Sequence, residues 1–334
     1  IVKLPLLTDI DLSVFENSEA NITEIDLHGV SAITEEDADT FNFSKFIGLK
    51  TVDLSSITVL PARTFKSCPV LESVKLDKCT KICEEAFAYC TSLVDMKLNS
   101  VTSIGENAFL YCASLQNFEA DSVTTFDFTT FDGCQNLKSL SFNSLLEIPV
   151  DSNGNLDIKN LDNLESFSAD KLAVIPDNFF KDCEKLTTVS FASATDVGDY
   201  AFYNTALSEF TMPLLETVGS YAFYGTDITD VNLPKVTSVG EYAFALCPSL
   251  LHVELPKAAQ LSLSSFEGSS AITSLLLPSV TTLPVTDNGV SYVSDKPLLV
   301  AFNCDSVNEI PADYFVNNPN LASVSMMNAK NIGD

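Results

Sequence analysis

The chain has 334 residues, of which 46% are hydrophobic, and this is enough apolar material to bury a large core. Its 45 aspartates and glutamates outnumber its 18 lysines and arginines, which gives a formal net charge of -27. This charge repels phosphate backbones and anionic lipid headgroups, and no apolar run reaches the roughly 18 residues of a membrane span. Nucleic acid is therefore excluded as an expected partner, and so is direct insertion into a membrane.

The elements predicted along the chain all come from one repeated phrase. Residues 100–115 read SVTSIGENAFLYCASL, and most of these landmarks return every 21 or 22 residues. Alignment on the pattern Phe-x-x-Cys-x-x-Leu-x-x-Val-x-Leu places its phenylalanine at Phe43, Phe65, Phe87, Phe109, Phe131, Phe180, Phe202, Phe223, Phe244, Phe266 and Phe315. Ile158 takes that place in one further copy, and Tyr292 or Val293 takes it in another.

The Val-x-Leu part of each copy alternates apolar and polar residues, which predicts a short strand. The Ala-Phe-x-x-Cys part spaces its apolar residues by three, which suits a helical turn. The pairs of inward residues in the strands are Ile25 and Leu27, Val52 and Leu54, Val74 and Leu76, Met96 and Leu98, Phe118 and Ala120, Leu140 and Phe142, Phe167 and Ala169, Val189 and Phe191, Phe210 and Met212, Val231 and Leu233, Val253 and Leu255, Leu275 and Leu277, Val300 and Phe302, and Val324 and Met326.

These pairs define fourteen rungs of 21 to 27 residues. One rung cannot close a core by itself, but stacked rungs cover each other's apolar edges. The predicted fold is therefore an α/β-type repeat solenoid that spans residues 1–334 as a single domain.

Three rungs are longer than the others, and we expect their inserts to project from one side of the stack. The inserts lie near residues 32–49, 147–164 and 282–298, and each is followed by a rung in which Pro61, Pro176 or Pro311 starts the turn. The pairs Asn153-Gly154 and Asn288-Gly289 favour tight hairpin turns in two of them.

One insert also resembles an oxygen-rich calcium loop. Asp151, Asn153, Asn155 and Asp157 alternate along it. Its glycine stands at the fourth place instead of the sixth, and no glutamate closes it, so this is a weak calcium candidate. We expect no cofactor.

The outward residues of the strands form a polar column along the sheet. In chain order they are Asp26, Asp53, Lys75, Lys97, Glu119, Ser141, Ser168, Ser190, Thr211, Asn232, Glu254, Leu276, Ala301 and Ser325. The column contains no aromatic residue, although Trp, Tyr and Arg usually anchor protein contacts. Two interpretations stay open: a contact surface that includes Lys75, Lys97, Glu119, Asn232 and Glu254, or a solvated sheet face.

Tyrosines gather at a different repeat position, over three adjacent rungs. Tyr200, Tyr221 and Tyr242 precede the repeated Ala-Phe, and Tyr203 and Tyr224 follow the phenylalanine. Their rings can pack between rungs with the hydroxyls in water, or they can form an aromatic patch of the kind that interfaces use. We predict that these tyrosines and the hairpins, more than the sheet, hold the partner.

The nine cysteines read as structural thiols. Six of them, Cys68, Cys90, Cys112, Cys134, Cys183 and Cys247, share the position three residues after the repeated phenylalanine. A free cysteine behaves as a small hydrophobe, which suits a repeated core position. Cys79, Cys83 and Cys304 lie outside that position, and the C-x3-C spacing of Cys79 and Cys83 is a weak metal or redox signal.

Nothing in the sequence assembles a catalytic site. The two histidines, His28 and His252, are many rungs apart, and no serine or cysteine is placed to use either as a base. We therefore predict a protein that is not an enzyme.

The segments SVTSIGENAFLYCASLQNFEA, ATDVGDYAFYNTALSEFTMP and VTSVGEYAFALCPSLLHVELP combine Ile/Val-Gly, Ala-Phe, Cys-x-x-Leu and Val-x-Leu-Pro. In this combination nearly the whole chain resembles the BspA-like, or treponemal-type, bacterial leucine-rich repeat family. The resemblance implies a right-handed superhelix with a parallel sheet on its concave face and short helical turns and strands on its convex side. In the first half the proline after the strand is replaced by Asn, Ser or Asp, whereas Pro213, Pro234, Pro256 and Pro278 keep it.

The resemblance also implies a secreted or surface-displayed protein of host-associated bacteria, linked to adhesion. The main functional prediction is a recognition or adhesion protein that binds a host or neighbouring-cell protein, with a glycan as a possible partner. Two alternatives stay open: a spacer that presents another domain, and a carbohydrate-binding module. The first residue is not methionine and the last four, NIGD, open another repeat. We therefore expect a piece of a longer extracellular or cell-surface chain whose signal or anchor lies elsewhere.

Overall fold

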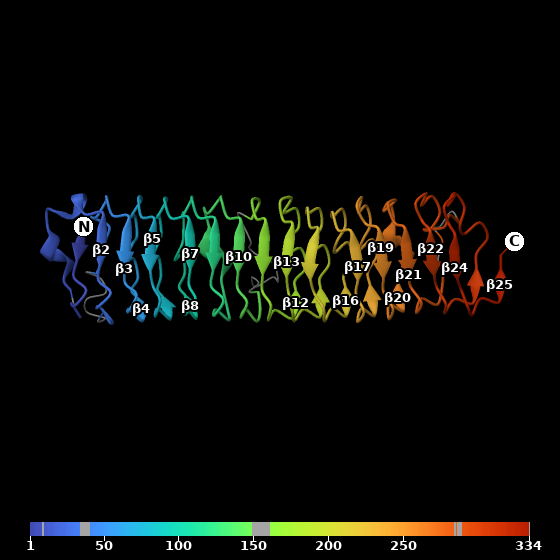
Figure 1. Ribbon diagram of the computed structural model, residues 1–334, viewed down its shortest axis with the longest axis horizontal. Helices are drawn as coiled ribbons and strands as arrows, with labels where there is room; N and C mark the ends of the chain where they lie inside the picture. Colours follow the sequence, from blue (N-terminus) through green and yellow to red (C-terminus); the bar gives the residue numbers. More distant parts are fainter. Residues whose placement is uncertain (9, 34–40, 149–160, 284, 286–288, 334) are drawn as a thin grey trace. The chain divides into compact units, whose positions relative to one another are not determined.

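The structure is a computed structural model that describes residues 1–8, 10–33, 41–148, 161–283, 285 and 289–333 (Figure 1). The chain divides into two compact units, Ile1–Lys171 and Leu172–Asp334. Both units are solenoids of stacked turns in which parallel strands pair from one turn to the next. Among the described residues, no helix has the length and apolar character of a membrane span.

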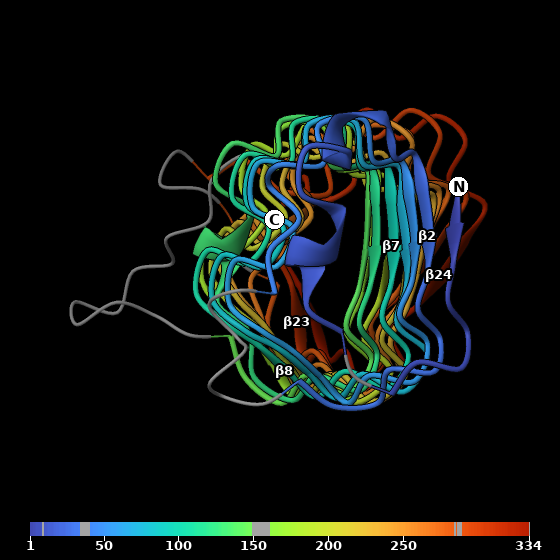
Figure 2. The same cartoon turned by 90° about the vertical axis from the view of Figure 1, so that its left-hand side faces the viewer.

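The first unit carries one main strand per turn. These strands are β1 (Val2–Lys3), β2 (Glu24–Asp26), β3 (Thr51–Asp53), β5 (Ser73–Lys75), β7 (Asp95–Lys97), β9 (Asn117–Glu119), β10 (Ser139–Ser141) and β11 (Ser166–Ser168). They belong to two sheets, one from β1 to β5 and one that begins at β7. A further sheet consists of β4 (Val59–Leu60), β6 (Lys81–Ile82) and β8 (Ser103–Ile104). Strands β2 and β7 lie on one side of the coiled chain, and β8 lies across from them (Figure 2).

The second unit repeats this plan. Its main strands are β13 (Thr188–Ser190), β15 (Glu209–Thr211), β17 (Asp230–Asn232), β19 (His252–Glu254), β21 (Ser274–Leu276), β22 (Ala301–Asn303) and β24 (Ser323–Ser325). The short strands are β12 (Val174–Ile175), β14 (Asp196–Val197), β16 (Thr217–Val218), β18 (Ser238–Val239), β20 (Gln260–Leu261), β23 (Glu309–Ile310) and β25 (Asn331–Ile332). All fourteen predicted rungs therefore have their strand, and β1 adds one that the pattern did not identify.

The repeated phenylalanines form the core as stacked columns of rings. In the first unit the rings of Phe43, Phe65, Phe87 and Phe109 lie 5.0, 5.3 and 5.1 Å apart, centroid to centroid, and tilt by at most 18°. In the second unit the corresponding column is Phe180, Phe202, Phe223, Phe244 and Phe266. All nine side chains are at most 1% exposed, which confirms the predicted core position.

The predicted burial of the six cysteines that follow the phenylalanine by three residues is also confirmed, and the structure shows a second role for their thiols. The Sγ of Cys90 lies 3.1 Å from the carbonyl oxygen of Phe65, the phenylalanine of the preceding rung. The thiols of Cys68, Cys112, Cys134 and Cys247 make the equivalent contact. The buried thiol therefore fills space and also satisfies a carbonyl that has lost its contact with water.

The predicted helical turn around each phenylalanine is mostly wrong. Residues two before and two after the phenylalanine have positive φ, as at Arg63 (61°) and Ser67 (62°) around Phe65. A helix cannot pass through such residues. The N–H of Phe65 instead donates to the carbonyl of Ala86 in the next rung, at 2.8 Å.

Helical turns are confined to four short 3-10 helices among the described residues. They are η1 (Leu12–Phe15), η2 (Glu19–Asn21), η3 (Phe128–Phe131) and η4 (Leu263–Phe266). Only η3 and η4 occupy the position where the repeat predicted a helical turn.

One strand was assigned to the wrong register. Phe302 and Cys304 are the inward pair of β22, at 1% and 0% exposure, whereas Val300 is 45% exposed. Asn303 pairs with Leu276 and takes the outward place that had been assigned to Ala301. The stretch is apolar enough to fit a two-residue alternation in either register, and packing of Phe302 against Leu275 decides between them.

The same region shows which residue takes the phenylalanine position in the irregular copy at Tyr292 and Val293. Val293 is 1% exposed and takes the phenylalanine position, while Tyr292 is half-buried. The other irregular copy, at Ile158, lies outside the described residues, as do residues 34–40 of the insert at 32–49.

Candidate functional site

Five tyrosines of the second unit form two stacked columns, which we call the tyrosine ladder. In the first column the rings of Tyr200, Tyr221 and Tyr242 lie 4.8 and 5.0 Å apart, with interplanar angles of 4° and 21°. In the second column Tyr203 and Tyr224 lie 4.9 Å apart at 9°. The columns touch each other at 5.6 Å through Tyr200 with Tyr203 and Tyr221 with Tyr224.

The repeat determines where the ladder lies, because the first column occupies the same backbone position in each of its rungs. Tyr200, Tyr221 and Tyr242 stand two residues before the core phenylalanine, with φ of 57°, 57° and 56°. Other rungs place Asn107, Asn178 and Asp313 there. Asn and Asp enter this left-handed region more readily than a bulky residue does, and a strained residue costs about 1–3 kcal/mol. Arg63 and Glu85 also hold this position, so its positive φ belongs to the repeat, and the second unit places three tyrosines there in succession.

Both sequence-based interpretations of the ladder hold in part. All five rings are half-buried, since they pack on one another and still reach solvent. The carboxylate of Glu267 and burial raise the pKa of Tyr242. Burial, followed by its neighbours Tyr200 and Tyr242, raises the pKa of Tyr221. The hydroxyls of Tyr221 and Tyr242 therefore stay protonated at neutral pH and remain available as donors.

A cation of the chain lies against one end of the ladder. The Nζ of Lys181 is 5.4 Å from the ring centroid of Tyr200 and 5.7 Å from that of Tyr203. Both distances lie within the range of cation–π attraction.

A second aromatic stack, which was not predicted from the sequence, lies in the first unit. Tyr89 and Tyr111 are 40% and 51% exposed, and their rings lie 5.2 Å apart at 15°. Both follow the core phenylalanine by two residues. Tyr111 lies over Gly133, where a Cβ would come within 2.4 Å of the Tyr111 ring. The 22-residue spacing of the tyrosines and the glycine in the next rung were the available signal.

The polar column on the sheet pairs with itself. Lys75 contacts Asp53 at 2.9 Å and Lys97 contacts Glu119 at 2.8 Å, both across neighbouring strands. The hydrogen bond and charge of Asp53 raise the pKa of Lys75. In the second unit the Asn232 amide lies 3.4 Å from Glu254.

Serines continue the column where the charges end. The Ser168 hydroxyl donates to that of Ser141 at 2.9 Å, and Ser141 donates to Asp121 at 2.5 Å. These contacts pair the side chains of the column with one another on a face that reaches solvent.

The hairpin and calcium candidates are only partly described. Asp151, Asn153, Gly154, Asn155, Asp157 and Asn288 lie outside the described residues. Gly289 has φ of 77°, and an antiparallel bridge joins Val285 to Ser291 around it. Within the described ranges, no group of three or more His, Cys, Asp or Glu side chains is arranged to hold a metal ion.

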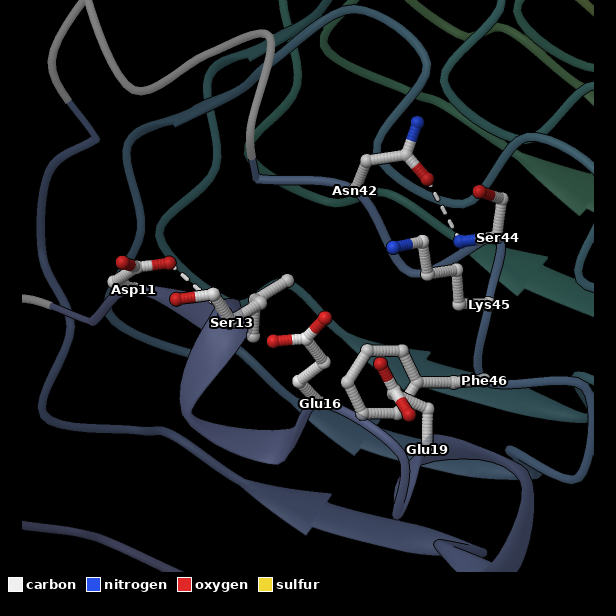
Figure 3. A pocket seen from close by; sticks show the side chains of 9 residues that line it. Asp11, Ser13, Glu16, Glu19, Asn42, Ser44, Lys45 and Phe46 are labelled. Carbon is white, nitrogen blue, oxygen red and sulfur yellow. Dashed lines mark hydrogen bonds between the residues drawn. The ribbon is translucent and has the colours of Figure 1, made fainter.

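A hollow of about 570 Å³ lies in the first unit next to η1 and η2. Its lining includes Asp11, Glu16, Glu19 and Lys45 (Figure 3). Asp11 is already engaged, because its Oδ1 accepts the Ser13 N–H at 2.9 Å as the cap of η1. The backbone hydrogen bond from Ser13 lowers the Asp11 pKa.

The histidines are not arranged for catalysis. His28 Nδ1 lies 2.7 Å from Asp26 on an exposed strand end. His252 Nδ1 lies 3.2 Å from the Thr273 hydroxyl, which also donates to the Leu251 carbonyl at 3.0 Å.

The thiols are no better placed as nucleophiles. Burial raises the pKa of Cys68 and of Cys304 to about 12, so both stay protonated and unreactive at neutral pH. The nine cysteines form no disulfide.

The comparisons place the chain among repeat proteins. A family model described as BspA type leucine rich repeat region matches the chain with six copies, over residues 2–93, 58–169, 105–218, 173–288 and 216–334. No curated protein sequence matches it.

Three solved structures are similar in fold. A leucine rich cell surface protein from Faecalibacterium prausnitzii has 19% identity and a TM-score of 0.34, with 91% of this chain and 83% of that chain covered. A leucine-rich repeat protein from Bacteroides ovatus has 18% identity and a TM-score of 0.33, with 99% and 82% covered. A leucine rich repeat protein from T. pallidum has 22% identity and a TM-score of 0.36, with 60% and 77% covered.

Proposed function

Because the chain belongs to the BspA-type leucine-rich repeat family, we propose that it is a non-enzymatic recognition protein, secreted or displayed at a cell surface. It binds a protein of a host or of a neighbouring cell. The contact is made through the tyrosine ladder together with the projecting inserts. The sheet column contributes less, because its lysines and carboxylates already pair with one another.

The observation that carries this proposal is the tyrosine ladder itself. Tyrosine is enriched at the centres of protein interfaces because it offers a large apolar face and a polar tip. The five rings hold one another in place by stacking, so little side-chain entropy is lost when a partner docks.

The charge of the chain narrows the kind of partner. With a net charge of -27, its surface attracts basic proteins and repels acidic ones. Exposed charges are screened over about 10 Å at 0.1 M salt. Binding is therefore expected to weaken as salt is raised.

The test is a binding screen of the purified chain against immobilised extracellular-matrix and serum proteins, alongside a glycan array, at two salt concentrations. The double variant Tyr221→Ala with Tyr242→Ala is expected to lose most of the binding to any protein hit. The matched control is Tyr89→Ala with Tyr111→Ala, which removes a stacked tyrosine pair from the first unit.

Other outcomes would favour the other two functions. Saturable binding to a glycan alone would favour a carbohydrate-binding module. No binding to either set would favour a spacer that presents another domain. Equal loss in both double variants would remove the ladder as the contact surface.

A further inference from the structure

The two ends of the tyrosine ladder differ. The rings stack along the direction in which rungs succeed one another, so inner ring faces cover each other and only end faces stay available. At the end nearer the start of the chain, the ammonium of Lys181 lies over Tyr200 and Tyr203. The chain thus supplies its own cation there.

At the other end, the last rings are Tyr242 and Tyr224. The corresponding positions of the following rung are held by Ser264 and Ala245, which are small and buried. Neither residue brings an aromatic ring or a cation to the stack. The ladder therefore ends without the partner that Lys181 provides at its beginning.

A carboxylate lies beside this second end. Glu267 is exposed and follows Phe266 by one residue, so it continues the column of Tyr203, Tyr224 and Ala245. Its charge is the largest cause of the raised pKa of Tyr242, and it adds to burial and Tyr203 in raising the pKa of Tyr224. No lysine or arginine within the described ranges forms an ion pair with Glu267. The nearby Lys296 directs its Nζ to the carbonyls of Phe266 and Ser269 instead, at 2.9 and 3.2 Å.

There is also room for an incoming side chain. Glu267 lines a hollow of about 250 Å³ together with Gly268, Ser270, Tyr292 and Lys296, whose buried ammonium is engaged by the Phe266 and Ser269 carbonyls. Two of these residues are small, and Tyr292 lies close enough to Tyr242 to contribute to its raised pKa. The end faces of Tyr224 and Tyr242, the small residues that follow them in the two columns and the Glu267 carboxylate are the parts that an aromatic cation site requires.

We propose that Tyr224, Tyr242 and Glu267 bind a lysine or arginine side chain of the partner protein. This inference rests on the proposed recognition function. It specifies which kind of side chain the partner protein presents to this end of the ladder. Lys181 occupies the equivalent end faces from within the chain. Its removal therefore opens a second, weaker cation site at Tyr200 and Tyr203, which lacks the neighbouring Glu267.

The test uses nuclear magnetic resonance of the whole chain with 13C-labelled tyrosine, each signal assigned by a Tyr→Phe variant. The probe is N-acetyl-arginine methylamide, and N-acetyl-citrulline methylamide is the uncharged control of the same shape. The signals of Tyr224 and Tyr242 are expected to shift with arginine, while those of Tyr200 and Tyr203 stay in place. Citrulline is expected to shift none of them.

Two variants sharpen the result. Glu267→Gln is expected to weaken arginine binding about three- to five-fold, as loss of one nearby charge does at a partly exposed site. Lys181→Met is expected to make the Tyr200 and Tyr203 signals respond. Unchanged signals of Tyr89 and Tyr111 confirm that each variant is folded.

Three results would overturn the proposal: no response to arginine, an equal response to citrulline, or an affinity that Glu267→Gln does not change. None of these would affect the wider function, which the protein-binding screen tests separately. Conversely, if the ladder variants bind the screened protein normally while arginine still shifts Tyr242, the site binds a free cation but the partner protein does not use it, and the proposal is overturned.

Discussion

The core position three residues after the phenylalanine is filled in opposite ways in two regions of the molecule. In the cysteine rungs, for example at Cys90, a neutral thiol donates to the carbonyl of Phe65 at 3.1 Å. In one rung of the second unit, Lys296 takes this place, and its ammonium donates to the carbonyl of Phe266 at 2.9 Å. Ser269 and Asn318 fill the same position in two further rungs, through a hydroxyl and an amide.

This difference teaches what the position requires. Cysteine, lysine, serine and asparagine at this position all donate a hydrogen bond to a carbonyl of the preceding rung, whereas Thr205 and Thr226 donate to the phenylalanine carbonyl of their own rung. The common requirement is therefore a donor for a buried carbonyl and not the sulfur. Lysine fits because Val293 replaces the larger phenylalanine of that rung, which leaves space for a longer neighbour. Burial of its charge lowers the Lys296 pKa from 10.5 to about 8.

The largest expected effect comes from cutting the phenylalanine column. Phe109 contacts Phe87, Phe118 and Phe131, with ring centroids 5.1, 5.0 and 6.4 Å away. Phe109→Ala is expected to lower the free energy of unfolding by about 3–5 kcal/mol, through lost burial and a residual cavity. Urea unfolding followed by far-UV circular dichroism measures it. Val293→Ala in the lysine rung removes fewer atoms and is expected to cost less; an equal loss would contradict the role assigned to the stacked rings.

The next effect is a rise in stability with pH that Lys296 contributes. Because the Lys296 pKa is lowered on folding, the charged form is penalised in the folded state wherever the unfolded chain is protonated. The penalty is full below pH 8 and disappears as the pH rises through the unfolded value of 10.5. The free energy of unfolding is therefore expected to gain about 3 kcal/mol from Lys296 across this window, at 1.36 kcal/mol per pKa unit.

The measurement needs a difference, because other groups titrate in the same window. Raised pKa values of the cysteines and tyrosines act in the opposite direction and lower stability as pH rises. Subtracting the unfolding free energy of Lys296→Met from that of the unaltered chain, at each pH from 7 to 11, isolates the lysine. A difference that does not change with pH would show that Lys296 is not buried as a titrating group.

Alternation and spacing predicted the strands and the core, because a stacked repeat uses the same side-chain direction in every rung. Val52 and Leu54 illustrate this, since a shift by one residue would turn both outward. Alternation did not determine the register at Val300 and Phe302, because apolar residues there fit both registers. It also left Val293 and Tyr292 undecided, and that uncertainty concealed Lys296, which aligns with the cysteines only once Val293 is placed.

The candidate site was predictable as a pattern but not as a surface. Spacing of 21 residues identified Tyr200, Tyr221 and Tyr242, yet their positive φ and partial exposure depend on how the turn folds. The cation over Tyr200 was not foreseen, because Lys181 is an ordinary polar residue until its rung is stacked. The prediction of helical turns was wrong in most rungs for the same reason, because hydrogen bonds between rungs outcompete hydrogen bonds within one turn.

A smaller effect tests whether the carbonyl or the sulfur matters in the cysteine rungs. Cys90→Ser keeps a donor for the Phe65 carbonyl, as Ser269 does in its own rung, whereas Cys90→Ala removes it. Alanine is expected to cost about 1–2 kcal/mol, from an unpaired buried carbonyl and a lost atom, and serine about half of that. Thermal unfolding of the two variants under one buffer gives the order. Serine as the more damaging change would mean that the apolar character of sulfur outweighs its hydrogen bond.

The smallest effect comes from a lysine that pairs in water. Lys97 contacts Glu119 at 2.8 Å on the sheet face, but the two side chains are 63% and 35% exposed. Desolvation therefore costs little and attraction is screened, so Lys97→Ala is expected to change the free energy of unfolding by less than about 1 kcal/mol. The change should shrink further between 0.05 and 0.5 M salt, because the Debye length falls several-fold over that range. Urea unfolding at both salt concentrations checks it, and a salt-independent loss would indicate that the Lys97 stem packs on the sheet instead of pairing its charge. The contrast with Lys296 then rests on burial and on the partner, since Lys97 pairs with a carboxylate in water whereas Lys296 donates to neutral carbonyls inside the core.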